Sequence, residues 1–141
     1  MRPNTGFYAR EINDLIQNTE QMGDKLHPSY EKIRNAIDHD QMADLDDKTL
    51  AEIHELFEKG TAVYRQLGKQ IGLLKPPAKV IGNHKRLEKA YLQYVAGCQE
   101  MTDSLQPSLD QKAFDLAEQK QDEATDTIYK TIQKITNLLL Q

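Results

Sequence analysis

Residues 50–105 of this chain read LAEIHELFEKGTAVYRQLGKQIGLLKPPAKVIGNHKRLEKAYLQYVAGCQEMTDSL and carry its clearest structural signal. On both sides of Lys75-Pro76-Pro77, apolar residues recur at steps of three and four. That spacing is typical of two helices that face a common core, and the prolines form the corner between them. The positions are Leu50, Ile53, Phe57, Gly60, Tyr64, Leu67, Ile71 and Leu74 before the corner, and Val80, His84, Leu87, Tyr91, Tyr94, Cys98, Met101 and Leu105 after it.

The same spacing continues outside this hairpin. Before it, apolar residues keep one phase from Ile12 to Ile37 and pass Pro28 without a slip, which favours one long helix kinked near Pro28 over two separate helices. After it, Ser108 and Gln111 have the spacing of a capping box, and the apolar pattern resumes at Phe114. We therefore predict four helices, over residues 6–40, 47–74, 77–105 and 108–140.

Long helices with short connections predict one all-α domain over residues 1–141, folded as an antiparallel up-down-up-down four-helix bundle. Asp46 or Asp47 is the expected N-cap of the second helix. Counting away from the corners of such a bundle gives two layers of inner residues. One layer contains Tyr30, Phe57, Tyr94 and Gln121, and the other contains Met22, Leu67, His84 and Thr131.

Composition excludes several classes of protein. The formal net charge of −4 argues against general nucleic-acid binding, which needs a basic domain. No apolar run is long enough to cross a bilayer, so the protein is not expected to be transmembrane. Cys98 is the single cysteine, which rules out an internal disulfide, and its position predicts packing as a small apolar group.

Localisation stays open at the level of the sequence. Residues 1–6 have neither the apolar segment nor the small-residue cleavage site of a signal peptide. If a leader was removed from the natural chain, the protein would be extracytoplasmic, and otherwise it would be cytoplasmic.

Catalytic and metal-binding motifs are missing from the sequence. There is no Gly-x-Ser-x-Gly, no Walker-type glycine-rich loop, no Cys-x-x-Cys and no Glu-x-x-His. We therefore expect no catalytic residues, no cofactor and no metal, and we expect that the protein is not an enzyme.

Polar residues on the inner faces are the candidates for a pocket or a polar core. His84 is either a ligand-binding imidazole or a core histidine hydrogen-bonded to a neighbour such as Thr131. Tyrosines on the inner faces either line a small-molecule cavity or pack along the core with their hydroxyls near the rim. The amide of Gln121 would be satisfied by the Tyr30 and Tyr94 hydroxyls. The candidate set is His84, Tyr30, Tyr94, Gln121 and Thr131.

Charge is unevenly distributed along the chain. From Arg65 to Lys89 there are seven Lys or Arg residues and one acid, Glu88, whereas residues 34–52 and 99–123 are mainly acidic. In the predicted bundle the Pro76-Pro77 end is basic. These basic side chains either face an anionic envelope surface or are ordinary solvent-exposed charges without a partner surface. The candidate basic surface comprises Arg65, Lys69, Lys75, Lys79, Lys85, Arg86 and Lys89.

Two stretches resemble small helical-bundle domains of Firmicutes, over about residues 64–138. They are Leu74-Lys75-Pro76-Pro77-Ala78-Lys79 with His84, Leu87, Ala90-Tyr91 and Tyr94 following, and Phe114-Asp115-Leu116-Ala117-Glu118-Gln119-Lys120 with Ala124 following. Many members of this group are lipoproteins or secreted proteins of unknown function, and some are described as cell-wall-binding. The resemblance implies no catalytic residues. Unlike the pattern of those domains, the sequence predicts neither a leader nor a lipidated cysteine, which leaves the envelope location open.

Three functional hypotheses follow. The first is a non-enzymatic interaction domain whose partner is a protein or an anionic surface of the bacterial cell envelope. The second is a small-ligand-binding bundle with a pocket near His84 and the inner tyrosines. The third is a cytoplasmic immunity or regulatory bundle. The sequence leaves the oligomeric state undecided.

Overall fold

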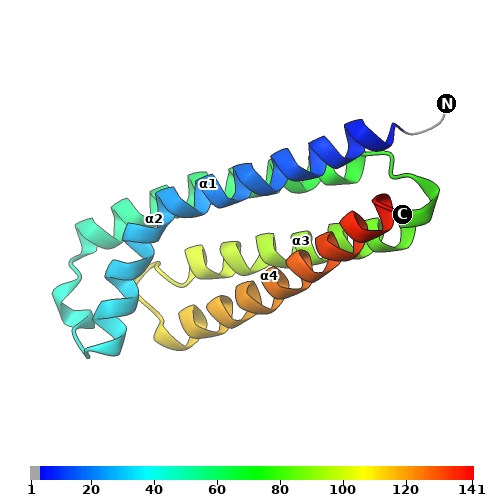
Figure 1. Cartoon of the computed structure of the whole chain (residues 1–141). Coiled ribbons are helices and arrows are strands. Elements are labelled where there is room, and N and C mark those ends of the chain that lie inside the picture. The colour runs from blue at the N-terminus through cyan, green and yellow to red at the C-terminus, as the bar shows by residue number, and fades with distance from the viewer. Residues whose placement is uncertain (1–3) are drawn as a thin grey trace.

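Four long helices make up the computed structural model, which describes residues 4–141 (Figure 1). No strand occurs within that range, so the prediction of an all-α chain with four helices is confirmed. The helices are α1 (Thr5–Asp38), α2 (Asp47–Leu73), α3 (Ile81–Asp103) and α4 (Gln111–Leu139), with short 3-10 turns η1 (Met42–Asp44) and η2 (Ala78–Val80) between them.

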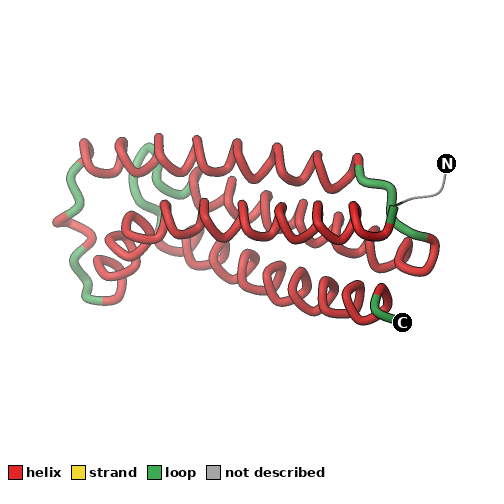
Figure 2. Tube along the Cα trace, turned by 45° about the horizontal axis from the view of Figure 1, so that its top comes forward, coloured by secondary structure: helices red, strands yellow, loops and turns green. Residues whose placement is uncertain are grey.

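The helices run side by side along one long axis. Both chain ends and the α2–α3 connection lie at one end of the molecule, and the α1–α2 and α3–α4 connections lie at the other (Figures 1 and 2). α3 and α4 pack along most of their length, whereas α1 and α4 touch least among the neighbouring helices. The seam between α1 and α4 is therefore the loosest in the bundle.

Three of the four helices begin with a side-chain cap. The backbone N–H groups of Phe7, Thr49 and Ala113 donate to Asn4, Asp46 and Asp110 at 2.9, 2.7 and 3.1 Å. Such a cap satisfies one of the N–H groups that a helix start leaves without an intrahelical partner. The expected cap at Asp46 is confirmed.

The predicted start of the fourth helix at Ser108 is wrong. α4 begins at Gln111 with Asp110 as its N-cap, so Ser108 and Gln111 form no capping box. Leu109, just before the cap, packs in the same apolar cluster as Phe114, four residues after the cap. This pair has the positions of a hydrophobic staple, which fixes the entry of the chain at Asp110.

Two other predicted boundaries shift. The third helix starts at Ile81 rather than at residue 77, because Pro77 keeps an extended ψ of 151° and η2 supplies the first turn. The first helix ends at Asp38 rather than at residue 40, because Asp40 adopts a left-handed φ of 55°. Between these ends α1 is one continuous helix that contains Pro28, as the unbroken apolar phase predicted.

The buried core is divided into two clusters. One lies toward the end with the termini and includes Tyr8, Ile12, Tyr64, Leu87 and Tyr91. The other lies toward the opposite end and comprises Ile33, Ile37, Leu50, Ile53, Phe57, Met101, Leu105, Phe114 and Ala117.

The middle of α1 is less deeply buried than its two ends. Buried residues of α1 occur only at Tyr8, Ile12 and Leu15 and then at Ile33, Ala36 and Ile37. The predicted inner residues between these groups, Met22, Leu26 and Tyr30, are only partly buried. This part of α1 packs against both clusters with partly buried side chains.

Each of the four helices carries several charged residues. None of the helices within residues 4–141 combines the length and the apolar character needed to cross a bilayer. This finding agrees with the expectation from the sequence.

Candidate functional site

A cavity of about 290 Å³ lies where the two core clusters meet. All four helices line it, and the lining residues are Gly23, Leu26, His27, Tyr30, Phe57, Thr61, Tyr64, Tyr94, Cys98, Met101, Thr102, Glu118, Gln121 and Asp122. Small-molecule sites in proteins usually measure about 300–1,000 Å³, so this volume suits a small ligand. The four residues that the helical register placed in one layer, Tyr30, Phe57, Tyr94 and Gln121, are all among its walls.

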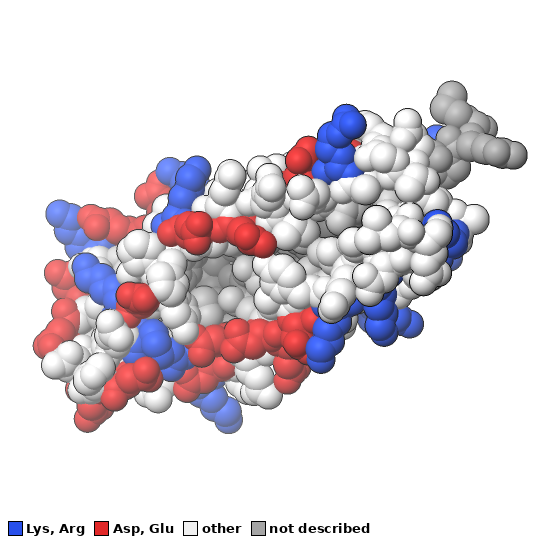
Figure 3. All heavy atoms as spheres, viewed as in Figure 1, with Lys and Arg blue, Asp and Glu red and all other residues white. Residues whose placement is uncertain are grey.

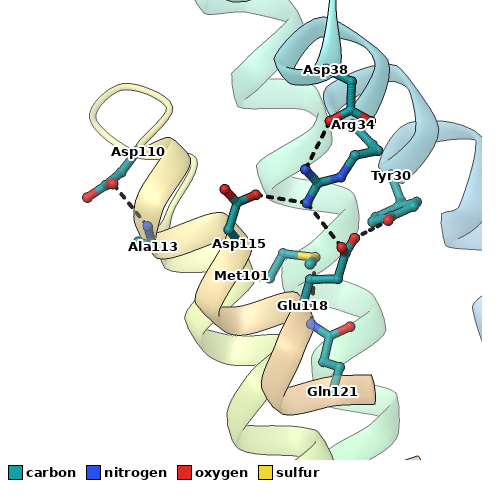
Figure 4. Close-up of polar contacts among 9 residues, drawn as sticks. All are labelled: Tyr30, Arg34, Asp38, Met101, Asp110, Ala113, Asp115, Glu118 and Gln121. Atoms are coloured by element: carbon teal, nitrogen blue, oxygen red, sulfur yellow. Dashed lines mark hydrogen bonds and ion pairs between the residues drawn. The ribbon is translucent and has the colours of Figure 1, made fainter. Parts of the chain in front are cut away.

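One side of the cavity mouth is closed by a polar bridge between α1 and α4 (Figure 4). Tyr30 donates its hydroxyl hydrogen to Oε1 of Glu118. Arg34 donates from Nη2 to Oε2 of Glu118 at 3.1 Å and to Asp115 at 3.0 Å. The guanidinium carbon of Arg34 lies 5.1 Å from the centre of the Phe114 ring, which adds a cation–π contact.

Farther along the same seam, a second bridge joins α1 to α4. Tyr129 of α4 donates its hydroxyl hydrogen to Oε1 of Glu20 at 2.9 Å. Beside this bridge is a smaller cavity of about 130 Å³, which shares Gly23 and Tyr94 with the larger one. Polar side chains thus connect α1 and α4 where apolar packing between them is sparse.

The inner wall of the larger cavity carries hydroxyl groups. Thr102 donates to the carbonyl of Cys98 at 2.8 Å, and its oxygen lies 3.4 Å from the Thr61 hydroxyl. Because the Thr102 hydrogen is already used, Thr61 is the donor in that weaker contact. Tyr64 and Tyr94 meet edge to face with their ring centres 5.1 Å apart. Burial raises the pKa of Tyr64 to about 12 and that of Tyr94 still further, so both hydroxyls stay protonated.

Acidic side chains occupy the mouth. Figure 3 shows a hollow between α1 and α4 with Asp and Glu side chains along both of its rims. Glu118 and Asp122 are the acidic lining residues, and no Lys or Arg lines the cavity within residues 4–141. Asp122 is exposed, and its partial desolvation together with repulsion from Glu118 raises its pKa above the ordinary value. His27 lies at the same mouth and is 2.6 Å from Glu31.

Cys98 lies in the core and also borders the cavity. Its predicted packing as a small buried group is confirmed, since its side chain is 8% exposed. Burial raises the pKa of the Cys98 thiol to about 12, although a hydrogen bond with Tyr94 acts in the opposite direction. The sulfur is therefore a neutral thiol at physiological pH and a poor nucleophile.

His84 does not line the cavity. It is 5% exposed in the part of the core nearer the termini, with Nδ1 2.8 Å from the Tyr8 hydroxyl and Nε2 3.0 Å from the Ile71 carbonyl oxygen. The predicted hydrogen bond to Thr131 and the predicted layer with Met22 are both wrong. Tyr8, the actual partner, lies more than three turns before Met22 on α1 and was not among the predicted inner residues.

Gln121 also makes different contacts from those predicted. Its amide nitrogen donates to the Gly97 carbonyl at 3.0 Å and lies 3.6 Å from the Met101 sulfur, rather than binding the tyrosine hydroxyls. Gly97 permits this approach of α3 to α4, since a Cβ there would lie 3.3 Å from two α4 backbone atoms. Thr131 is buried at 2% exposure and is not a cavity residue.

The predicted basic residues are all on the surface, and some of them lie near an exposed apolar end. Arg65, Lys69, Lys75, Lys79, Lys85, Arg86 and Lys89 are all exposed. At the end that carries both termini, Phe7, Leu73, Ile81 and Leu140 expose 52, 80, 42 and 82% of their surface. On the face in Figure 3, acidic and basic side chains are mixed at the opposite end.

Metal binding finds no support in the described part of the chain. Among residues 4–141, no group of three or more His, Cys, Asp or Glu side chains is arranged to hold a metal ion. The cavity is instead a mixed aromatic and hydrogen-bonding site.

The sequence analysis missed several residues of the site. Arg34, Glu118 and Asp122 lie at the edges of the apolar faces, where charge ordinarily indicates solvent exposure. Glu118 follows Phe114 by four residues and precedes Gln121 by three, so it shares their side of α4. That spacing was a usable signal for Glu118, but none pointed to its pairing with α1.

Comparison of the chain with protein-family models, curated proteins and solved structures found no match. The resemblance to helical-bundle domains of Firmicutes therefore stays a prediction, and the function is argued from the site alone.

Proposed function

We propose that this protein is a non-enzymatic small-ligand-binding bundle whose site is the cavity between α1 and α4. The observation that carries the proposal is a cavity of about 290 Å³ with walls from all four helices, placed between two otherwise packed core clusters. Binding sites in helical bundles are built from inward side chains of facing helices. Compared with the sequence hypothesis, the site keeps the tyrosines and leaves out His84.

A glycine beside the cavity keeps part of this space open at a cost to helix stability, which supports a functional role. In this chain Gly23 stands beside the cavity, where a Cβ would meet only the Tyr64 hydroxyl at 3.7 Å. A larger side chain at residue 23 would fill space and also favour the helix, because glycine weakens a helix by about 1 kcal/mol relative to alanine.

The test compares Gly23→Leu with the unaltered protein in a thermal-shift screen of small metabolites. We expect a ligand that raises the melting temperature of the unaltered protein and has no effect on Gly23→Leu, whose side chain occupies the cavity. The matched control is Gly82→Leu on α3, since a Cβ added to Gly82 would meet no atom within 4 Å and the residue does not line the cavity. Equal ligand shifts in Gly23→Leu and the unaltered protein would rule the cavity out.

The finer architecture forms part of the proposal. We infer that the helices follow an antiparallel up-down-up-down order and that α1 bends at Pro28, next to the cavity residue His27. Pro28 has no N–H to donate within α1, which weakens the helix there and favours a bend. Residual dipolar couplings of backbone amides test both points, and a single straight axis through residues 5–38 would contradict the bend.

A second candidate function is docking on an anionic lipid surface of the cell envelope through the end that carries the termini. One observation favours it. The exposed apolar residues Phe7, Leu73, Ile81 and Leu140 lie at the same end as Lys79 and other basic residues. Apolar side chains that enter the headgroup region, together with Lys and Arg around them, are the usual elements of peripheral membrane binding.

Vesicle co-sedimentation tests the docking hypothesis. We expect binding to vesicles containing phosphatidylserine that weakens in Lys79→Glu/Lys85→Glu and persists in a Lys48→Glu/Lys59→Glu control at the other half of the molecule. Equal sedimentation of both double variants, or no preference for anionic over neutral vesicles, would exclude this function.

A further inference from the structure

The cavity between α1 and α4 offers several hydrogen-bond acceptors. Both donor hydrogens of the Gln121 amide face Gly97 and Met101, so its Oε1 is left without a hydrogen-bond partner among residues 4–141. Tyr30 uses its hydrogen on Glu118. The Thr102 and Thr61 hydrogens are used within the inner wall, as described above. A ligand that supplies hydrogens would find acceptors at Gln121 and at the carboxylates of the mouth, whereas the Tyr64 and Tyr94 hydroxyls in the same walls can both donate and accept.

The charge at the mouth has the sign that attracts a cation. Glu118 is already paired with Tyr30 and Arg34, whereas Asp122 has no hydrogen bond or ion pair among the described residues. Within residues 4–141 no lysine or arginine lines the cavity, and the single basic lining residue, His27, is paired with Glu31. Partial desolvation and the nearby Glu118 raise the pKa of Asp122, so an incoming positive charge would relieve an existing repulsion.

The walls are aromatic. Tyr30, Phe57, Tyr64 and Tyr94 contribute four rings to a cavity of about 290 Å³. Ring faces attract ammonium groups, an interaction worth about 0.5–1 kcal/mol at exposed sites and more where water is excluded. The remainder of an organic ligand would pack against apolar side chains of the same walls.

We propose that the ligand of this cavity is a small organic ammonium ion, with its charged group toward Asp122 and its apolar part among the tyrosine rings. An anionic ligand would meet the two carboxylates of the mouth, Glu118 and Asp122. A metal ion would find too few carboxylate or imidazole ligands within residues 4–141. This inference rests on the proposed ligand-binding function and adds the chemical class of the ligand.

The experiment uses three probes of nearly equal shape and different charge: benzylamine, benzyl alcohol and benzoate. Each is titrated into the full chain at constant ionic strength, and dissociation constants come from the backbone amide shifts of the lining residues. We expect benzylamine to bind at least tenfold more tightly than benzyl alcohol, with benzoate the weakest. In Asp122→Asn the preference for the amine over the alcohol should fall to threefold or less.

Asp126→Asn is the matched control, because it removes one negative charge from the same helix outside the cavity. Asp126 is paired with Lys130 at 2.8 Å and is not a lining residue. It should keep the tenfold preference, whereas loss of the preference in both variants would indicate a general charge effect and overturn the role of Asp122. Equal binding of alcohol and amine would overturn the ammonium proposal and leave the cavity as a ligand site. Failure of benzylamine to bind would also overturn it, and the Gly23→Leu screen decides the ligand-binding function separately.

Discussion

His84 shows how a single buried polar residue is satisfied in this core. The Ile71 carbonyl can only accept, so Nε2 of His84 carries the hydrogen and Nδ1 accepts from the Tyr8 hydroxyl. The imidazole is thus neutral and fixed in one tautomer, and it ties the start of α1 to the end of α2. Packing, rather than ligand binding, accounts for its position.

The Tyr8–His84 contact should be visible in a double-mutant cycle. Tyr8→Phe removes one hydrogen bond and should lower the free energy of unfolding by about 1 kcal/mol. His84→Leu leaves the buried Tyr8 hydroxyl without its partner and should cost about 1–3 kcal/mol. The cost of the double variant should be smaller than the sum of the two single costs. Strict additivity in urea denaturation would show that the two side chains do not interact.

The pH dependence of stability provides a separate test of His84. Burial lowers the pKa of His84 below its ordinary value of 6.5, although the Ile71 carbonyl and Glu88 act in the opposite direction. Below pH 6.5 the unfolded chain therefore binds a proton that the folded chain resists, and stability falls as the pH decreases. The stability difference between the unaltered protein and His84→Leu should shrink from about pH 7.5 to about pH 5.5. A constant difference would contradict a neutral buried imidazole.

At the scale of the helix, the pairs of helices differ in how closely they approach. The glycines that the sequence placed on α2 meet side chains: Gly60 faces Leu26, Gly68 faces Tyr91 and Gly72 faces Glu88. The close backbone approach occurs instead at Gly97, between α3 and α4. This tight pairing contrasts with the loose α1–α4 seam, where the cavity lies.

Gly97→Ala should therefore destabilise the protein although alanine favours a helix. Its Cβ would lie 2.9 Å from the Gln121 Cγ and 3.3 Å from the Ala117 carbonyl oxygen and the Gln121 nitrogen. Overpacking of this kind costs about 1–3 kcal/mol, which exceeds the gain in helix propensity of about 1 kcal/mol. Gly82→Ala, on the same helix in open space, should not destabilise. Equal effects of the two substitutions on the free energy of unfolding would contradict the close approach.

Local sequence rules predict the helices well and their ends less well. The apolar spacing correctly gives four helices and the continuity of α1 through Pro28, because each signal lies within one helix. The predicted start of α4 was wrong because Ser108 and Asp110 are both suitable N-cap residues. The choice between them depends on whether Leu109 reaches the core. That choice depends on packing against other helices, so a rule that considers only neighbouring residues cannot predict it.

At the scale of the whole molecule, the arrangement of helices that forms the cavity cannot be predicted from any single segment of the sequence. The periodicity of α1 treats Met22, Leu26 and Tyr30 like its other inner residues, yet in the structure they are only partly buried. The layer of Tyr30, Phe57, Tyr94 and Gln121 was predictable, because the number of residues from each turn determines how far along the bundle a side chain lies. The cavity was not predictable, because it depends on how far α1 and α4 separate and on the pairing of Arg34 with Glu118 across them.

The two regions proposed to bind a ligand and a lipid surface differ in their charge and in their exposed apolar side chains. The end that carries the termini exposes large apolar side chains near lysines, while the cavity and its acidic rims lie nearer the middle of the rod. Ligand binding at the cavity and docking of the terminal end use separate residues. Substitutions in one region should therefore leave the other activity unchanged.

The central claim is that a small organic ammonium ion binds between α1 and α4, and methionine methyl resonances test it most directly. Met101 lines the cavity, whereas Met42 lies in η1 at the far end of the molecule. In a benzylamine titration we predict a saturable shift of the Met101 methyl signal, no shift at Met42, and loss of the Met101 shift in Gly23→Leu. A Met101 signal that stays unchanged at every benzylamine concentration, or that shifts equally in Gly23→Leu, would contradict the account.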